Sequence, residues 1–394
     1  MKQFKKIIIS SILTAIFLVG MMAVPYRPCF GKEELEMESP SVVLMELSSG
    51  QILYEKNPDE ARRPASVTKI MTMLLVFDAI QDGKLSLDDE IVVSAHAASM
   101  GGSQVYLEEG EVQSLEDLLK CMIVSSANDA AVAVSEAVAG SEEAFVQMMN
   151  DRAKELGMEH THFENVCGLE AKDHMMSAKD VALLSRELIL THPEVFDYTT
   201  IWMDTIIHKT AKGESEFGLA NTNKFLKKYE GANGLKTGYT SDAGFSMSAT
   251  ATKNGMTLIA VVMGSTTKEI RYEDARKLLD YGFANCELYQ DANVLGEQNQ
   301  VSIKNAAQNP ISVYAQSKFH YVMTDGTDTT KITKKLNLDK KQAPLKKDET
   351  VGYMEYFYQD KMIGKVAIKT TDAVEEEKFP NVFLSILYQY TNMY

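Results

Sequence analysis

The feature that most constrains this chain is an apolar segment from Pro64 to Ile80, PASVTKIMTMLLVFDAI. It follows the turn signal Arg62-Arg63-Pro64, and a helix apolar on almost all sides has to lie inside a large domain. Ser66 and Lys69 lie three residues apart in its first turn and share one face. A buried ammonium is costly unless its pKa is lowered, and such a lysine is a base for a neighbouring hydroxyl. The segment therefore predicts a nucleophile and its base, or else a capping serine beside a lysine that reaches solvent.

Two further stretches place polar groups beside apolar elements. Ser126-Ala127-Asn128 lies between a helix predicted at 114–124 and an Ala/Val-rich helix predicted at 130–139. Lys236-Thr237-Gly238 leads into the β-rich region 245–263. Buried loops must satisfy their polar groups, so these stretches favour a site; local capping and an ordinary edge-strand lysine are the alternatives.

Turn signals and periodicity outline two structural regions. A hairpin at 41–54 precedes several helices, and strands at 245–263 turn at Lys253-Asn254-Gly255 before a helix at 270–283. This order predicts an α/β (α+β) domain with an antiparallel sheet covered by helices. From residue 293 onward, short alternating runs separated by polar turns predict a small all-β domain.

The two ends of the chain carry separate signals. Basic residues precede an apolar stretch at 7–24, which predicts an export signal over 1–31 with an undefined cleavage position; an uncleaved anchor is the alternative. In the tail 379–394, Val382, Phe383, Ile386 and Leu387 recur at helical spacing. The tail is expected to contact a membrane through apolar burial or, alternatively, to pack on the β domain.

Charge and cysteine content exclude several classes of protein. The formal net charge of −15 argues against nucleic acid as a partner. Cys121, Cys167 and Cys286 would remain after signal cleavage; they make no disulfide framework, although one pair stays open. No Cys/His/Asp cluster has metal-ligand spacing, so neither a metal nor another cofactor is expected.

The three motifs together are more specific than any one of them. Ser-x-x-Lys, Ser-x-Asn and Lys-Thr-Gly occur here in the order found in penicillin-binding proteins and serine β-lactamases. The chain resembles the low-molecular-weight penicillin-binding proteins that are serine-type D-alanyl-D-alanine carboxypeptidases. The resemblance rests on residues 63–72, 126–130 and 234–240, and extends closely over 39–288.

This resemblance implies a transpeptidase/serine β-lactamase-like fold for 39–288 and a less similar second domain over 293–378. It implies removal of the terminal D-alanine from peptidoglycan pentapeptide stems through an acyl-enzyme, with β-lactam antibiotics as covalent inhibitors. It also implies export to the cell wall or the outer face of the cytoplasmic membrane. The site residues it assigns are, for catalysis, Ser66, Lys69, Ser126, Asn128 and Lys236 and, for substrate binding, Lys236, Thr237, Gly238 and Tyr239.

The resemblance also implies a role for each group. Ser66 would attack the carbonyl between two D-alanines while Lys69 accepts its proton, and Ser126 would relay a proton to the leaving D-alanine. Asn128 would orient the substrate amide. Lys236 would supply positive charge that helps hold Lys69 neutral.

The remaining roles concern the substrate's end and the oxyanion. Thr237 would bind the terminal carboxylate, and the backbone N–H groups of Ser66 and Tyr239 would form the oxyanion hole. Two positions depart from the family. Ala127 stands where relatives often have Gly, and Ser265-Thr266 stands where some have a basic residue near the carboxylate.

Two rival functions remain at this level. A secreted β-lactamase needs a water-activating Glu in a Glu-x-x-Leu-Asn-like loop, and none occurs between Asn150 and Thr240. A non-catalytic wall-binding or sensing homologue would keep the fold, but here every hydroxyl and ammonium group of the motifs is present. Carboxypeptidase versus endopeptidase action, the stem-peptide variant and the oligomeric state stay open.

Overall fold

The computed structural model describes residues 35–324 and 328–377. The predicted export signal and the predicted tail contact at 379–394 both lie outside these residues. The chain divides between Glu36 and Met37, and every described helix and strand belongs to the second unit, Met37–Tyr394. Within the described part, no helix combines the length and apolarity that a membrane span requires.

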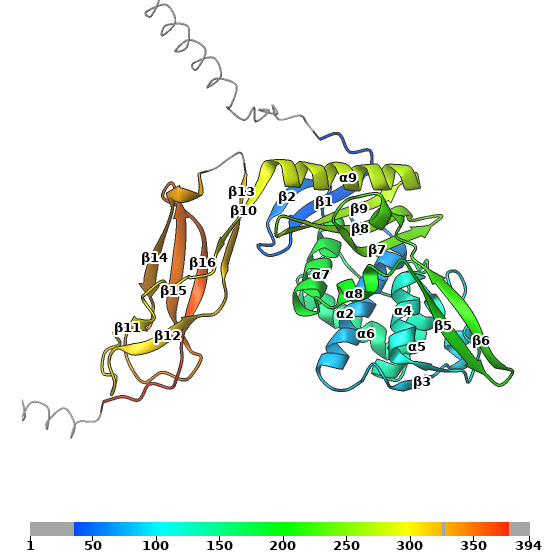
Figure 1. The fold of residues 1–394 in the computed structure, drawn as a ribbon, viewed down its shortest axis with the longest axis horizontal. Coiled ribbons are helices and arrows are strands. Elements are labelled where there is room, and N and C mark those ends of the chain that lie inside the picture. Colours follow the sequence, from blue (N-terminus) through cyan, green and yellow to red (C-terminus); the bar gives the residue numbers. More distant parts are fainter. Residues whose placement is uncertain (1–34, 325–327, 378–394) are drawn as a thin grey trace, which may run out of the picture. The chain divides into compact units, whose positions relative to one another are not determined.

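An antiparallel five-stranded sheet organises residues 37–285, here called the N-terminal module (Figure 1). Its strand order is β2 (Ile52–Lys56), β1 (Ser41–Glu46), β9 (Met256–Ser265), β8 (Gly244–Lys253) and β7 (Ala232–Thr240). The predicted hairpins are confirmed, because β1 pairs with β2 and β8 with β9. Asn254 and Gly255 both have positive φ, as a tight hairpin turn requires. Strand β7, which carries Lys236-Thr237-Gly238, lies at one edge.

Helices cover both faces of this sheet, as the fold class predicts (Figure 1). On one side lies α9 (Lys268–Asn285), which packs on β8 and β9. On the other side lie α2 (Lys69–Gln81), α4 (Leu115–Val124), α5 (Asn128–Ala139), α6 (Glu142–Glu155), α7 (Ala178–Thr191) and the short α8 (Val195–Thr199). Ser114, Ser141 and Ser177 cap α4, α6 and α7 by accepting backbone N–H bonds.

Helix α2 is the buried element that the sequence predicts. Its residues from Lys69 to Phe77 are all buried, which explains why the helix carries apolar side chains on almost all of its sides. The prediction differs at the start, because Ser66 lies in a separate 3₁₀ turn, η2 (Ala65–Thr68), rather than in the first α-helical turn. Backbone segments from other parts of the chain pack closely against this tighter turn. 3₁₀ geometry is common at the ends of α-helices.

Shorter elements complete the N-terminal module. β3 (Glu90–Val92) pairs with β4 (Val112–Ser114), β5 (Met203–Thr210) pairs with β6 (Gly213–Ala220), and the helical turns are α3 (Ala95–Ala98) and η3 (Lys224–Lys227). The β5–β6 hairpin is mostly exposed. It was not predicted, because a hairpin with little buried surface lacks the alternation that marks a half-buried strand.

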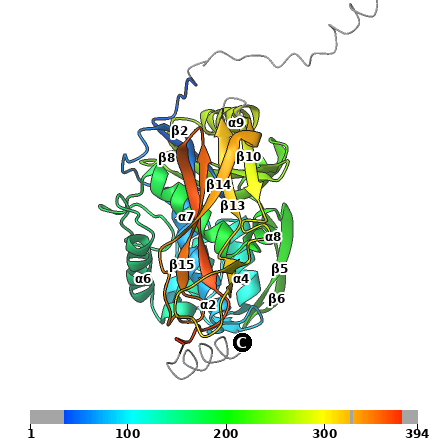
Figure 2. The same ribbon diagram turned by 90° about the vertical axis from the view of Figure 1, so that its left-hand side faces the viewer.

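Residues 286–377 form an all-β module, which confirms the predicted β-rich C-terminal region. Its strands are β10 (Cys286–Asp291), β11 (Gln300–Val301), β12 (Ile311–Ala315), β13 (Phe319–Thr324), β14 (Ile332–Leu338), β15 (Thr350–Tyr358) and β16 (Lys361–Thr370), with the turn η4 (Thr329–Lys331). β10 pairs with β13, and the others form a sheet of order β11-β12-β16-β15-β14, in which β14 and β15 run side by side (Figure 2). Phe319 stacks on Tyr356 at 3.7 Å between ring centroids within this module's core.

Candidate active site

The turn that carries Ser66 is enclosed by two glycines. A Cβ on Gly238 of β7 would lie 2.8 Å from the Pro64 carbonyl oxygen and 3.0 Å from the Ser66 nitrogen. A Cβ on Gly168 would overlap the Ala65 carbonyl, and Gly168 has a φ of +81°. Glycine at both positions therefore lets β7 and the loop at 164–174 approach the turn's backbone.

Lys69 is the group best placed to activate Ser66. Its Nζ lies 3.1 Å from Ser66 Oγ, 2.7 Å from Asn128 Oδ1 and 3.0 Å from the Cys167 carbonyl oxygen. Burial lowers the pKa of this fully buried amine, although the Cys167 thiol and the Asp129 carboxyl partly oppose the shift. A neutral amine can donate to the amide and carbonyl oxygens and turn its lone pair toward the serine hydroxyl. The arrangement is that of a general base beside its nucleophile.

Lys236 makes a second hydroxyl–amine pair. Its Nζ donates to Ser126 Oγ at 2.8 Å and to the Thr237 carbonyl oxygen at 3.1 Å, and the side chain is 1% exposed. Burial lowers the pKa of Lys236 well below its ordinary value, and the charges of Lys69 and Arg271 add to this effect. An incoming anion would reverse the shift, because a negative charge favours the ammonium form.

Asn128 is the first residue of α5 and connects the Ser66–Lys69 pair to the segment that contains Gly101. Its Oδ1 accepts from Lys69, and its Nδ2 donates to the Gly101 carbonyl oxygen at 2.7 Å. The side chain is 4% exposed. Ser126, two residues earlier, has a φ of +60°, an uncommon conformation that turns the chain between α4 and α5. Such backbone strain is often found at functional sites.

A cavity of about 250 Å³ opens between these groups. Of the eight predicted residues, five line it: Ser66, Ser126, Thr237, Gly238 and Tyr239. Lys69, Asn128 and Lys236 are buried: Lys69 contacts Ser66, Lys236 contacts Ser126, and Asn128 is connected to the cavity through its hydrogen bond with Lys69. The ring of Tyr239 is 57% exposed and stacks on Phe245 at 4.3 Å, at the cavity wall. The structure thus brings together all three motifs.

The cavity also contains Arg271, which the sequence reading missed. It comes from α9, is 4% exposed, and donates to the carbonyl oxygens of Gly238 and Ser246, each at 3.3 Å. Its Nε has no hydrogen-bond partner among the described residues. Although Ser265-Thr266 carries no basic residue, Arg271 brings a guanidinium to the cavity. Its only local signal is an arginine near the start of the helix that follows the last strand.

His174, a second residue that was not predicted, contacts the turn that carries Ser66. The Glu164 backbone N–H donates to His174 Nδ1 at 3.1 Å, so Nε2 carries the ring proton and donates to Thr68 Oγ1 at 2.8 Å. Burial, followed by the charges of His162 and Arg63, lowers the pKa of His174 to about 4. The neutral ring therefore ties the loop that supplies the Cys167 carbonyl to the turn that carries Ser66.

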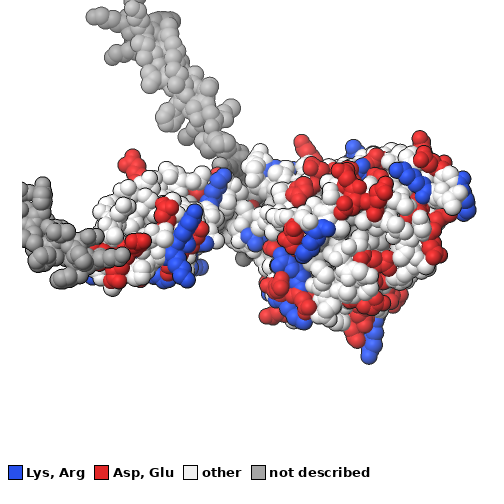
Figure 3. Space-filling model, turned by 90° about the horizontal axis from the view of Figure 1, so that it is seen from below, with Lys and Arg blue, Asp and Glu red and all other residues white. Residues whose placement is uncertain are grey.

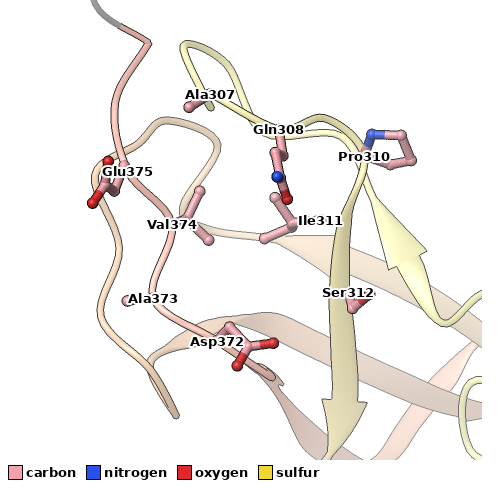
Figure 4. Close-up of a pocket in the computed structure, with 9 residues that line it drawn as sticks. All are labelled: Ala307, Gln308, Pro310, Ile311, Ser312, Asp372, Ala373, Val374 and Glu375. Atoms are coloured by element: carbon pink, nitrogen blue, oxygen red, sulfur yellow. The ribbon is translucent and has the colours of Figure 1, made fainter.

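A larger hollow of about 370 Å³ lies in the β module (Figure 4). Its polar lining includes Gln308, Ser312, Asp372 and Glu375, with no lysine or histidine to activate the serine. Across the described residues, no group of three or more His, Cys, Asp or Glu side chains is arranged to hold a metal ion. The predicted site residues meet at the smaller cavity of the N-terminal module and not at this hollow.

Comparison with known proteins identifies the family. Residues 29–267 match the family model for D-alanyl-D-alanine carboxypeptidase, and 283–376 match the C-terminal domain of penicillin-binding protein 5. The chain is 36% identical to D-alanyl-D-alanine carboxypeptidase DacF of Bacillus subtilis (strain 168), over 95% of this chain and 96% of that protein. It is 32% identical to DacC of Escherichia coli (strain K12), over 94% of each.

Solved structures of penicillin-binding proteins are also similar to this chain. Penicillin-binding protein 5 of Haemophilus influenzae superposes with a TM-score of 0.74 at 30% identity, covering 86% of this chain and 98% of that one. Penicillin-binding protein D2 of Listeria monocytogenes, in its ampicillin-bound form, gives a TM-score of 0.52 at 34% identity, over 63% of this chain and 98% of that one. The chain belongs to the D-alanyl-D-alanine carboxypeptidase family and is a serine-type D-Ala-D-Ala carboxypeptidase of the penicillin-binding kind.

Proposed function

We propose that Ser66 is the nucleophile that forms the acyl-enzyme and that Lys69 is its general base. This assignment rests on the surroundings of the Lys69 amine. The amine is buried and donates to Asn128 Oδ1 and to the Cys167 carbonyl oxygen, and its Nζ lies 3.1 Å from Ser66 Oγ. Transfer of the Ser66 proton to Lys69 accompanies attack on the carbonyl between the two D-alanines. Water then hydrolyses the ester and regenerates the serine.

Ser126 and Lys236 serve the leaving group. The Ser126 hydroxyl lines the cavity and accepts from Lys236, so it can pass a proton toward the departing D-alanine nitrogen while the lysine supplies charge. Asn128 orients the substrate amide in this proposal, and its contact with Lys69 gives it the further task of holding the base in place. The backbone N–H groups of Ser66 and Tyr239 form the oxyanion hole, a role supported by the tight packing of Gly238 on Ser66.

The substrate's terminal carboxylate binds among Thr237, Lys236 and Arg271. The side-chain hydrogen bonds of the two cations go to hydroxyl and carbonyl oxygens, so their charge is available to an anion. A carboxylate in this place raises the pKa of Lys236, which then holds the proton that its role requires. Substrate binding therefore sets the charge state of the site.

The test is mass spectrometry of muropeptides treated with the pure protein. Pentapeptide stems should become tetrapeptide stems with release of D-alanine, and Ser66→Ala should abolish the conversion. Cleavage of cross-linked dimers alone would show an endopeptidase and overturn the proposed carboxypeptidase action. The β-lactamase alternative predicts rapid turnover of penicillin, whereas a carboxypeptidase should hold it as a stable adduct.

The protein's place in the cell follows from its substrate class. Peptidoglycan stem peptides lie outside the cytoplasmic membrane, so we propose export directed by 1–31 and action at the outer membrane face or cell wall. The tail 379–394 would add a membrane contact, and 39–288 and 293–378 would form the peptidase and β domains. Truncation after Glu377 should keep penicillin binding and reduce membrane retention of the mature protein. Unchanged fractionation would exclude the tail contact.

A further inference from the structure

A group of lysines lies on aromatic rings beside the catalytic cavity. We call it the lysine–aromatic patch, and its residues are Lys224, Lys227, Lys228 and Lys253 with Trp202, Tyr229 and Tyr272. The first three lysines are exposed and lie in η3 or directly after it, ahead of β7. Lys253 is the last residue of β8. None of them belongs to the three catalytic motifs.

The rings hold the ammonium groups in defined places. Lys224 Nζ lies 4.7 Å and Lys227 Nζ 5.2 Å from the centroid of Trp202, the chain's single tryptophan. Lys228 Nζ lies 4.8 Å from the Tyr272 ring, at cation–π distance like the others. Ordering a lysine in advance reduces the entropy lost when it later binds an anion. The patch is therefore better prepared for binding than a set of free surface lysines.

The lysines of the patch make no salt bridge with another described residue, although the Tyr229 hydroxyl donates to Asp280 Oδ1 at 2.9 Å. The acid within the same stretch is Glu230. The nearby Arg276 takes up the carboxylates of Glu273 and Asp280. Elsewhere the protein is acidic, with a formal net charge of −15, and acidic side chains gather on the face of the N-terminal module seen in Figure 3. An anionic partner is therefore drawn to this patch and repelled by much of the remaining surface.

The patch adjoins two residues that line the catalytic cavity. Thr222 lines the cavity and precedes Lys224 by two residues. Tyr272 carries Lys228 on its ring and also has the Arg271 guanidinium 4.6 Å from its centroid, and Arg271 lines the cavity. A ligand on the patch would therefore lie close to segments that line the catalytic cavity, rather than inside the cavity.

We propose that the lysine–aromatic patch binds carboxylates of a neighbouring stem peptide in polymeric peptidoglycan, and so holds the polymer while another stem occupies the catalytic cavity. The inference rests on the proposed carboxypeptidase function, because that function makes the polymer the substrate. Charge complementarity supports carboxylates as the occupant, since each additional stem of the polymer brings free carboxylates close to the one being cut. A short soluble peptide has no second stem and does not reach the patch.

The experiment compares two substrates with matched charge variants. Lys224→Glu/Lys227→Glu reverses the two lysines on Trp202. Lys84→Glu/Lys154→Glu makes the same charge change at two exposed lysines elsewhere, which pair with Asp82 and Asp151. The probes are a short soluble peptide ending in D-Ala-D-Ala and purified peptidoglycan, used before and after removal of its phosphate-bearing polymers. Sedimentation with the insoluble polymer measures binding, and D-alanine release measures activity on both probes.

The patch variant should hydrolyse the short peptide at the wild-type rate and lose about tenfold in binding to the polymer, as expected for reversing two charges at a contact. The control variant should lose much less, Lys224→Arg/Lys227→Arg should retain binding, and salt should weaken the wild-type interaction. Equal polymer binding by patch and control variants would overturn the proposal. So would a difference seen only while phosphate-bearing polymers remain attached. Failure of the wild-type protein to cleave the short peptide would instead count against the proposed function.

Discussion

Replacing Gly168 by alanine tests how the Ser66 turn is held. Gly168 has a φ of +81°, and a Cβ there would overlap the Ala65 carbonyl and approach Thr68 Oγ1 to 2.7 Å. Gly140, at the C-terminal cap of α5, has a φ of +82° with nothing within 4 Å of its Cβ position. The two substitutions therefore share the backbone strain and differ only in the steric contact.

The shared strain should cost each variant about 1–2 kcal/mol of unfolding free energy, because L-residues tolerate the left-handed region poorly. Only Gly168→Ala must also displace the turn that carries Ser66. To reach an ordinary van der Waals distance from the new Cβ, Thr68 Oγ1 must move by roughly 0.7 Å. A displacement approaching 1 Å between nucleophile and base lowers rates by about 100-fold. Gly168→Ala should thus acylate far more slowly than Gly140→Ala.

Stopped-flow acylation with a fluorescent penicillin measures the rate, and urea unfolding measures the stability of each variant. Gly140→Ala should acylate at the wild-type rate and lose about 1–2 kcal/mol of unfolding free energy. The reasoning is refuted if Gly168→Ala acylates within twofold of Gly140→Ala, since the loop would then not position the turn.

Three further predictions concern the charged groups. Lys69→Arg should be nearly inactive because arginine does not deprotonate, whereas Lys236→Arg should keep part of the acylation rate and Lys236→Ala should lose on the order of 2–4 kcal/mol of transition-state stabilisation. Arg271→Ala should raise KM for a peptide with a free carboxylate more than it lowers kcat, and should change KM little for the peptide amide. Because folding lowers the pKa of His174 from 6.5 to about 4, the unfolded chain binds its proton more readily. Stability should therefore fall by about 3 kcal/mol as pH drops from 6.5 to 4, and urea unfolding of His174→Gln should show a smaller loss.

Each of these predictions has a contrary outcome. Faster acylation by Lys69→Arg than by Lys236→Arg would mean that the base is assigned to the wrong lysine. Equal KM effects of Arg271→Ala on the acid and the amide would remove its role in carboxylate binding. The same acid-dependent loss of stability in wild type and in His174→Gln would show that other groups carry it.

The parts of the fold that local sequence pattern determines were predicted correctly. Helix α2 is apolar all round because it is buried all round, and the β8–β9 hairpin has an Asn-Gly turn whose geometry few other sequences adopt. The three motifs are also local, and each places its functional groups within four residues. The 3₁₀ turn at Ser66 was not predicted, because it depends on contacts with Gly168 and Gly238 from distant segments.

The supporting residues of the site could not be predicted for the same reason. Cys167 contributes a backbone carbonyl to Lys69 across 98 residues of sequence, and any residue type supplies that atom. His174 reaches Thr68 across 106 residues, and a buried histidine has no local signature. Arg271 lies on a helix whose packing against the sheet brings it to the cavity. Only tertiary structure reveals these three contributions.

The most direct test of the account is the position of the covalent adduct formed with penicillin. The wild-type protein is treated with penicillin, digested, and analysed by mass spectrometry. One penicilloyl adduct is expected on the peptide that contains Ser66, located on Ser66 by fragmentation and absent from Ser66→Ala, while Ser126→Ala should still form the adduct slowly on Ser66. An adduct on Ser126 or any other residue, or an adduct that persists in Ser66→Ala, would contradict it.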